Sequence, residues 1–280
     1  MPNVYLHPTT SLQLDSLAAD LPQALLFTGP EGVGLTSVVT YLASRLHVNV
    51  ITVLPEKDEK VDLEKGVITV DVIRRLYSTT KTIETGTRII VIDYVERMGM
   101  QAQNAFLKLL EEPGLNTHFI LLTHNPSKLL PTIRSRVQTV EVKPITAQQS
   151  AELLDELRVS DATKRAQLLF IASGLPAALS QLAGDDDVFE KRAQIVRDAR
   201  SYLQGTMYDR LKVALAYKDD RPRALTLLQD AMKLLQSSMT GLAGKKQGAE
   251  VVHKIEALLK VHERIEANGN IRLQLAAVMV

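Results

Sequence analysis

The sequence predicts a parallel α/β domain followed by a small helical domain and a larger all-helical domain. Short apolar runs alternate with helical patterns as far as residue 143, as in parallel sheets that helices cover on both faces. Strand signals disappear after Pro144. A glycine-rich loop, GPEGVGLT at 29–36, joins the first apolar run to the first helical pattern. In this fold class, phosphate-binding loops lie between a strand and the helix that follows it.

The first half of the chain supplies the expected sheet. Strands are predicted at five apolar runs, residues 24–28, 48–53, 88–93, 118–123 and 139–143. Helices are predicted at about 36–46 and 101–112, and the stretch 67–80 continues the alternation. The charged segment 55–65 is expected to be a solvated loop, because charged side chains seldom enter a core.

The second half is expected to be helical throughout. Apolar residues recur at helical spacing between 146 and 183, and the acidic run GDDD at 184–187 is expected to be a linker. Helices are predicted from about 188 onward, with breaks near 218–221, 241–246 and 268–270. These features divide the chain into three predicted domains, 1–144, 145–186 and 187–280.

Composition excludes several classes of function. The 280 residues are 45% hydrophobic and 23% charged, which is a globular composition. A formal charge of +1, from 33 basic and 32 acidic residues, gives no global attraction to nucleic acid. The absence of cysteine excludes disulfides, thiol catalysis and cysteine-based zinc sites. No segment has the apolar length of a membrane span, so a soluble cytoplasmic protein is expected.

The glycine-rich loop keeps only part of a phosphate-binding motif. Gly29, Gly34 and Thr36 occupy the positions of two glycines and the magnesium-binding hydroxyl, but Leu35 occupies the position of the lysine. An ordinary glycine-rich turn is the simpler alternative. The third apolar run ends in Asp93, an acid of the kind that holds magnesium in P-loop ATPases. Together these residues form a candidate, degenerate nucleotide site, and no separate metal site is expected.

A long run later in the chain carries a family resemblance. The run from Gln103 to Gln138, QNAFLKLLEEPGLNTHFILLTHNPSKLLPTIRSRVQ, closely resembles the corresponding run of bacterial DNA sliding-clamp loader subunits, which are AAA+ proteins. Ser135 and Arg136 match the first two residues of the family's Ser-Arg-Cys motif, and Val137 replaces the cysteine. The resemblance implies that Arg136, with Ser135 beside it, acts in trans as an arginine finger on ATP bound by a neighbouring subunit.

The same resemblance implies that hydrolysis is lost. Tyr94 stands where many hydrolysing members carry a water-activating glutamate, and GLPAALS at 174–180 lacks the arginine of a second sensor. Thr123 matches a residue that senses the γ-phosphate, but a threonine at a strand end is commonplace and receives no assigned role. Within the family the delta-prime type fits best, because it often combines a degraded loop with a retained Ser-Arg pair. The four-cysteine zinc module of many members is absent.

The expected function is that of a non-hydrolysing structural subunit of a DNA polymerase III clamp loader, with a helical lid and a helical collar that joins the subunits. Expected partners are the homologous delta and tau/gamma subunits, the sliding clamp and, through the complex, primer-template DNA. No cofactor is assigned, although ATP or ADP is a possible ligand, and no zinc is expected. The alternatives are an ATP-hydrolysing tau/gamma-type subunit with an atypical loop, and an unrelated P-loop switch or kinase. The run from Gln103 to Gln138 argues against the second alternative.

Overall fold

The computed structural model describes residues 4–48, 50–80, 86–239 and 245–277. The chain divides into two compact units, Met1–Gly184 and Asp185–Val280. The first unit contains a parallel sheet and ends in three short helices, and the second unit is helical in its described part. The expected order of an α/β region followed by helices is therefore confirmed.

The first unit is built on a five-stranded sheet whose paired strands all run parallel. The strands are β1 (Ala24–Thr28), β2 (Val50–Val53), β5 (Arg88–Ile92), β6 (Thr117–Thr123) and β7 (Gln138–Glu141). Their order across the sheet is β2-β5-β6-β1-β7. All five predicted strands are present, and β1 has β6 and β7 as its neighbours.

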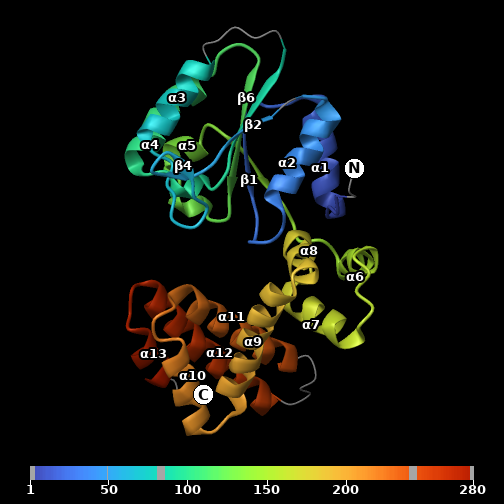
Figure 1. Ribbon diagram of the computed structural model, residues 1–280, viewed down its shortest axis with the longest axis vertical. Helices are drawn as coiled ribbons and strands as arrows, with labels where there is room; N and C mark the ends of the chain where they lie inside the picture. The colour runs from blue at the N-terminus through green and yellow to red at the C-terminus, as the bar shows by residue number, and fades with distance from the viewer. Residues whose placement is uncertain (1–3, 49, 81–85, 240–244, 278–280) are drawn as a thin grey trace. The chain divides into compact units, whose positions relative to one another are not determined.

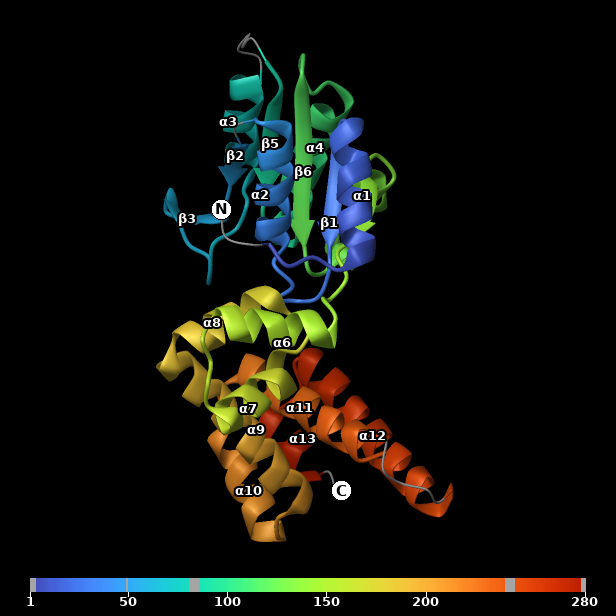
Figure 2. The same cartoon turned by 90° about the vertical axis from the view of Figure 1, so that its right-hand side faces the viewer.

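Helices cover both faces of this sheet. They are α1 (Pro8–Ala19) and α2 (Leu35–Leu46) on one face, and α3 (Val70–Thr80), α4 (Met100–Glu111) and the short α5 (Pro131–Arg134) on the other. Figure 2 shows β5, β6 and β1 side by side, with α1 and α2 over the nearer face. Leu25 and Phe27 of β1 pack on the α1–α2 side, whereas Leu26 packs on the α3–α4 side. Burial on both faces explains why β1, β5 and β6 are apolar runs.

Helix α1 was not predicted. Its start carries a proline in the first turn, and the side chain of His7 accepts a hydrogen bond from the N–H of Thr9. Only three of its side chains are buried, those of Thr10, Leu14 and Leu17. The helix was missed because so short an apolar stripe gives little periodic signal.

The charged segment 55–65 lies at the surface, as expected, but it forms a hairpin rather than a loop. Strands β3 (Glu56–Lys57) and β4 (Lys60–Val61) are antiparallel. The two turn residues, Asp58 and Glu59, have φ of 52° and 61°, which suits the tight two-residue turns of hairpins. Charge content alone could not reveal this local pairing.

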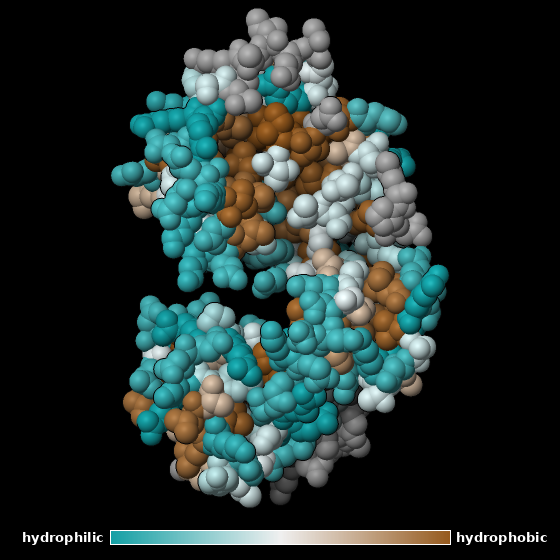
Figure 3. Space-filling view, viewed as in Figure 1, coloured by the Kyte–Doolittle hydropathy of each residue, from teal (hydrophilic) through white to brown (hydrophobic). Residues whose placement is uncertain are grey.

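Strand β2 forms one edge of the sheet, and exposed apolar side chains lie on it and on the hairpin. Ile51 of β2 and Val61 of β4 are exposed, and both line a cavity of about 230 Å³ between β2, β4 and α3. Figure 3 shows apolar surface, in brown, on this unit. The hairpin lies against the cavity and is fastened to α3 by an ion pair between Glu56 and Arg75. It therefore shields part of an open strand edge.

The three helices that end the first unit confirm the helical segment expected between 146 and 183. They are α6 (Ala147–Glu156), α7 (Ala162–Ala172) and α8 (Pro176–Gly184). The linker predicted at 184–187 does coincide with the boundary between the two units, but it is not a loop, because α8 ends at Gly184 and the next helix begins at Asp186. The side chain of Asp185 accepts hydrogen bonds from the N–H groups of Asp187 and Val188. The acidic run is a helix start, where negative charge is favourable.

The second unit contains α9 (Asp186–Gln204), α10 (Met207–Ala216), α11 (Arg221–Met239), α12 (Lys245–Glu266) and α13 (Ile271–Ala277), all seen in Figure 1. Their shared core includes Tyr202, Tyr217, Leu227 and Leu258. The predicted breaks near 218–221 and 268–270 are confirmed. The break predicted at 241–246 lies mostly outside the described residues. Among the helices that the structure describes, none is both long and apolar enough to cross a membrane.

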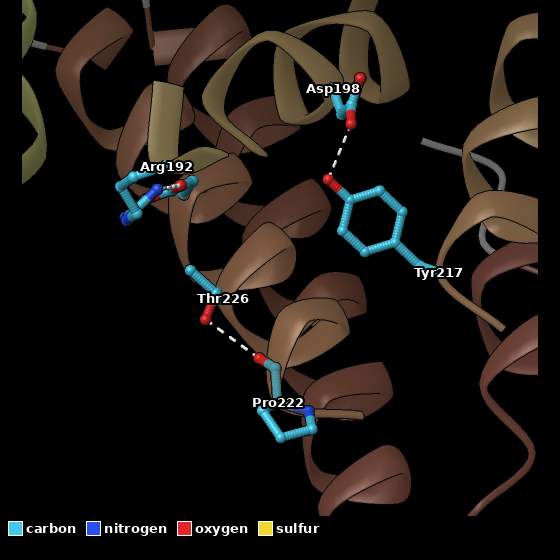
Figure 4. A network of polar contacts seen from close by, with 6 residues as sticks. Arg192, Asp198, Tyr217, Pro222 and Thr226 are labelled. Atoms are coloured by element: carbon cyan, nitrogen blue, oxygen red, sulfur yellow. Dashed lines mark hydrogen bonds and ion pairs between the residues drawn. The ribbon is translucent and has the colours of Figure 1, made fainter. Parts of the chain in front are cut away.

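Polar contacts fasten the helices of the second unit to one another (Figure 4). Both carboxylate oxygens of the buried Asp230 on α11 contact the guanidinium of Arg192 on α9. The hydroxyl of Tyr217 donates to Asp198 at 2.7 Å. Burial, together with this carboxylate, raises the pKa of Tyr217 well above its usual range. These contacts join α9 to the helices packed against it and satisfy groups that burial would otherwise leave unpaired.

Candidate functional site

The glycine-rich loop follows β1 and ends at the start of α2. Gly34 is the residue that precedes α2, with φ of 87°, and Gly32 has φ of 83°, a region that favours glycine. A Cβ added at Gly29 would lie 2.7 Å from the carbonyl oxygen of Val142. The backbone therefore requires these glycines. A loop of this form before a helix N-terminus can bind anions through its N–H groups and the helix dipole, although a plain turn would need the same glycines.

Leu35 gives this loop an apolar side chain where a phosphate-binding loop needs a cation. It is 4% exposed and belongs to the core cluster that also contains Val38 and Leu42 of α2. The partly buried Leu175 packs against the same cluster. The side chain at this position therefore contributes to folding and supplies no charge for phosphate oxygens.

The structure brings together the two residues predicted to be suited to magnesium, Thr36 and Asp93. The hydroxyl of Thr36 donates to Asp93 at 3.4 Å, and the N–H of Tyr94 donates to the other carboxylate oxygen at 2.8 Å. Burial raises the pKa of Asp93, and these two donors oppose that effect only in part. His124 joins the group, because its Nδ1 lies 2.8 Å from the carbonyl oxygen of Gly29. Within the described residues, no cluster of three or more acidic, histidine or cysteine side chains is arranged to hold a metal ion.

Tyr94 provides no base for activating water. Its backbone is left-handed, with φ of 53°, and the guanidinium of Arg97 lies 4.8 Å from the centre of its ring. Burial and the neighbouring Asp93 raise the pKa of the Tyr94 hydroxyl, so it stays protonated at neutral pH. The residue after Asp93 is therefore an aromatic ring stacked on a cation, and it supplies no carboxylate.

The segment 174–180 docks directly on the loop. The carbonyl oxygen of Gly32 accepts hydrogen bonds from the N–H groups of Ala177 and Ala178, at 3.0 and 3.2 Å. A Cβ added at Gly32 would lie only 2.7 Å from that of Ala178. Two alanines thus allow the start of α8 to approach the loop closely. The lack of an arginine in this segment was evident from the sequence. The contact with the loop was not predicted, because its only signal is the small size of the two alanines.

Thr123, at the end of β6, is 1% exposed. Its hydroxyl oxygen accepts a hydrogen bond from the N–H of Asn125 at 3.0 Å. This contact stabilises the turn after β6. It gives the hydroxyl a local structural role, and no functional role follows from it.

Ser135 and Arg136 lie on the surface just after α5. The Ser135 hydroxyl donates to the carbonyl oxygen of Thr132 at 3.1 Å, and the Arg136 guanidinium donates to the same oxygen at 3.0 Å. A second guanidinium nitrogen lies 2.9 Å from a carboxylate oxygen of Glu111, the last residue of α4. The Arg136 side chain remains 41% exposed. Ser135 therefore closes the end of α5, whereas Arg136 presents a positive charge to the solvent.

The register of the sheet separates Arg136 from the glycine-rich loop. Gln138 pairs with Leu25 near the start of β1, whereas the loop begins at Gly29 after the end of β1. Four residues of strand span about 13 Å, and Arg136 precedes Gln138 by two more residues. Strands β1 and β7 are parallel, so Arg136 lies at the amino-end edge of the sheet and the loop lies at the carboxyl-end edge. The candidate residues therefore form two groups, and Arg136 is remote from the loop of its own chain.

Gln103 connects the elements that carry Arg136, a role that sequence reasoning missed. This buried amide donates to the carbonyl oxygens of Met98 and Lys128, at 3.0 and 3.2 Å, and accepts from the N–H of Leu130 at 2.7 Å. Leu130 immediately precedes α5, so the amide fastens α4 to the start of α5. The only sequence signal was a polar residue on an otherwise apolar helix face.

Comparison with known proteins gives three findings. The family model described as DNA polymerase III, delta subunit, matches residues 43–146. Subunit delta' of DNA polymerase III from Pseudomonas aeruginosa is 35% identical over 166 residues, which cover 58% of this chain and 48% of that protein. The corresponding subunit from Bacillus subtilis is 32% identical over 115 residues, or 41% of this chain and 34% of that protein. The chain thus spans half or less of the length of these relatives.

A solved structure supports the fold. A DNA polymerase III gamma subunit-related protein from Thermotoga maritima shares 20% sequence identity with this chain and has a TM-score of 0.52. The match covers 94% of this chain and 96% of that one. At this identity the likeness concerns the fold alone, and it agrees with the predicted architecture of a parallel sheet followed by helices.

Proposed function

We propose that this chain, whose resemblance to delta-prime clamp-loader subunits is confirmed by sequence similarity, is a DNA polymerase III clamp-loader subunit that does not hydrolyse ATP. In this proposal Arg136 is an arginine finger for ATP bound by a neighbouring subunit. The observation that carries the proposal is the position of Arg136. It is exposed, anchored by Glu111, and at the opposite edge of the sheet from its own glycine-rich loop.

An arginine in that position suits action in trans. A guanidinium stabilises the negative charge that develops on phosphoryl oxygens, and such fingers contribute about 10³ to 10⁵ in rate. To act on its own loop, Arg136 would have to cross the length of the sheet, which the parallel register of β1 and β7 prevents. A second subunit can bring its nucleotide to the amino-end edge instead.

The chain's own loop supports the non-hydrolysing half of the proposal. Leu35 is buried and uncharged, and Tyr94 supplies no base. Gly29, Gly34 and Thr36 retain the backbone and hydroxyl of a phosphate cradle. We therefore propose that ATP or ADP bound there would remain intact.

The proposed assembly follows from the family resemblance. The partners are homologous delta and tau/gamma subunits in a ring, and the helical second unit is the collar that joins them. The sliding clamp and primer-template DNA would be engaged by the complex as a whole. The near-neutral charge of the chain agrees with DNA contacts that are local and shared.

The test of Arg136 is the DNA-stimulated ATPase of a clamp loader reconstituted with the Arg136→Ala chain. The rate of ATP hydrolysis at the site that Arg136 serves should fall almost to zero, because an arginine finger contributes about 10³-fold or more to that rate. The total ATPase rate of the loader should therefore fall by at least the part that this site contributes. Gel filtration should show an intact complex. Arg134→Ala is the matched control, since Arg134 is an exposed arginine on the same short helix. Equal turnover with the Arg136→Ala and wild-type chains would refute the finger assignment.

One observation favours a second function, that of an ATP-hydrolysing tau/gamma-type subunit with an atypical loop. Thr36 and Asp93, the two residues suited to magnesium, remain in contact at 3.4 Å. Leu35 outweighs this contact, because loss of the lysine removes positive charge from the place where phosphate charge develops. Hydrolysis by the purified chain alone separates the two functions.

A further inference from the structure

We infer that Glu111 is a positioning residue for the guanidinium of Arg136, an inference that rests on the proposed function. Glu111 ends α4 and Arg136 follows α5, so the two residues come from different elements. A carboxylate oxygen of Glu111 lies 2.9 Å from one terminal guanidinium nitrogen, and the carbonyl oxygen of Thr132 lies 3.0 Å from the other. Two acceptors on two nitrogens fix the direction of the side chain and the plane of its guanidinium.

Helix stability does not explain an acid at this position. The carboxyl end of a helix carries a partial negative charge, so a glutamate in the last turn is unfavourable by itself. Hydrophobic burial does not explain Glu111 either, because its side chain is 54% exposed. The Glu111 carboxylate instead forms an ion pair with Arg136.

The frame beneath this pair is fixed. Gln103 ties α4 to the N–H of Leu130 at the start of α5, and Ile133 of α5 is fully buried in the core cluster that contains Phe106 and Leu109 of α4. Glu111 and Thr132 therefore belong to helices that are packed and hydrogen-bonded together. A surface arginine without such anchors samples many rotamers, and that freedom would be lost on binding a phosphate. Glu111 lowers this loss by holding the side chain in one arrangement before the neighbour's nucleotide arrives.

The experiment is a comparison of chains in the reconstituted loader, with kcat and KM for ATP measured in the presence of primed DNA. Glu111→Ala should lower kcat at the affected site about twofold to fivefold, the range expected for one exposed ion pair. Total kcat should then lie between those of the wild-type and Arg136→Ala loaders, with KM unchanged. Glu111→Gln keeps an oxygen acceptor and should recover part of the loss. Glu112→Ala, a change of the exposed neighbouring glutamate, should leave kcat at the wild-type value.

The double variant Glu111→Ala with Arg136→Ala supplies the decisive readout. If Glu111 acts only through Arg136, the double variant should match Arg136→Ala alone. A further fall in kcat in the double variant would overturn the inference, because it would indicate a structural role for Glu111. Wild-type or higher kcat with Glu111→Ala, alongside a reduced kcat with Arg136→Ala, would overturn the inference and leave the proposed function standing. An Arg136→Ala loader with wild-type kcat would refute both.

Discussion

Asp93 keeps a carboxylate in a half-buried position at the end of β5. Loss of hydration raises the pKa of this carboxyl, and hydrogen bonds from Tyr94 and Thr36 oppose the effect only in part. A raised pKa means that the folded chain binds the proton more tightly than the unfolded chain. The ionised side chain therefore lowers the stability of the folded state at neutral pH. Residues that weaken the fold in this way are more typical of functional sites than of structural ones.

The Asp93→Asn variant should be more stable than the wild-type chain at pH 7. For an acid whose folded pKa is raised, stability falls as the pH rises from the ordinary value of 3.8 through the folded pKa. The difference in stability between the Asp93→Asn and wild-type chains should therefore develop as the pH rises through this range and should persist at higher pH. Urea unfolding at several pH values, followed by circular dichroism because the chain has no tryptophan, measures the difference.

Asp62→Asn is the control, because the pKa of Asp62 is lowered whereas that of Asp93 is raised. The N–H of Lys65 is the main cause that lowers the pKa of Asp62, so its ionised form contributes stability above its unfolded pKa and loses it as the pH falls. Asparagine at position 62 should not stabilise the chain at pH 7. A less stable Asp93→Asn variant at pH 7 would contradict the account of Asp93.

Helix α4 runs between the two edges of the sheet that carry the candidate residues. It begins shortly after Asp93, and it ends at Glu111, beside Arg136. Its twelve residues span about 18 Å. Gln103 fastens its first turn to the connection between β6 and α5. The position of Arg136 therefore depends on how α4 and α5 are held together.

Replacing Gln103 by leucine should lower the free energy of unfolding by about 1–3 kcal/mol, because buried backbone groups at Met98, Lys128 and Leu130 would lose their partner. Urea unfolding at pH 7 measures this change. Gln101→Leu, on the exposed face of the same helix, should change stability by less than about 0.5 kcal/mol. Equal stabilities for the two variants would show that the Gln103 amide does not fasten these elements.

Elements with long apolar patterns were predictable, and elements set by local contacts were not. Strands β1, β5 and β6 are buried on both faces, so each appears in the sequence as an apolar run, whereas the edge strands β2 and β7 are partly exposed. Helix α1 and the hairpin β3–β4 depend on a helix start at His7 and on a tight turn at Asp58 and Glu59. The acidic run at 184–187 was taken for a linker because composition does not distinguish a loop from the cap of a helix.

At the candidate site, residue types were predictable and partners were not. The loss of a cation at Leu35 and the presence of Arg136 follow from motif positions. Glu111 and Gln103 stood within the same run of sequence, but their contacts join residues 25 to 27 positions apart. Only the packing of α4 against α5 brings those residues together.

At the scale of the whole molecule, the chain combines a glycine-rich loop and an exposed arginine in the first unit with a second unit that is helical in its described part. The family-model match, residues 43–146, lies entirely within the first unit. The collar role of the second unit therefore rests on the family resemblance and on its separate helical core. We propose that the glycine-rich loop of the first unit does not turn over ATP.

The most direct test of that claim is ATP hydrolysis by the purified chain alone, with the Thr36→Ala variant measured beside it. No turnover above background is predicted for either protein, because Leu35 supplies no positive charge and Tyr94 supplies no base. Steady turnover by the wild-type chain that Thr36→Ala abolishes would contradict the account.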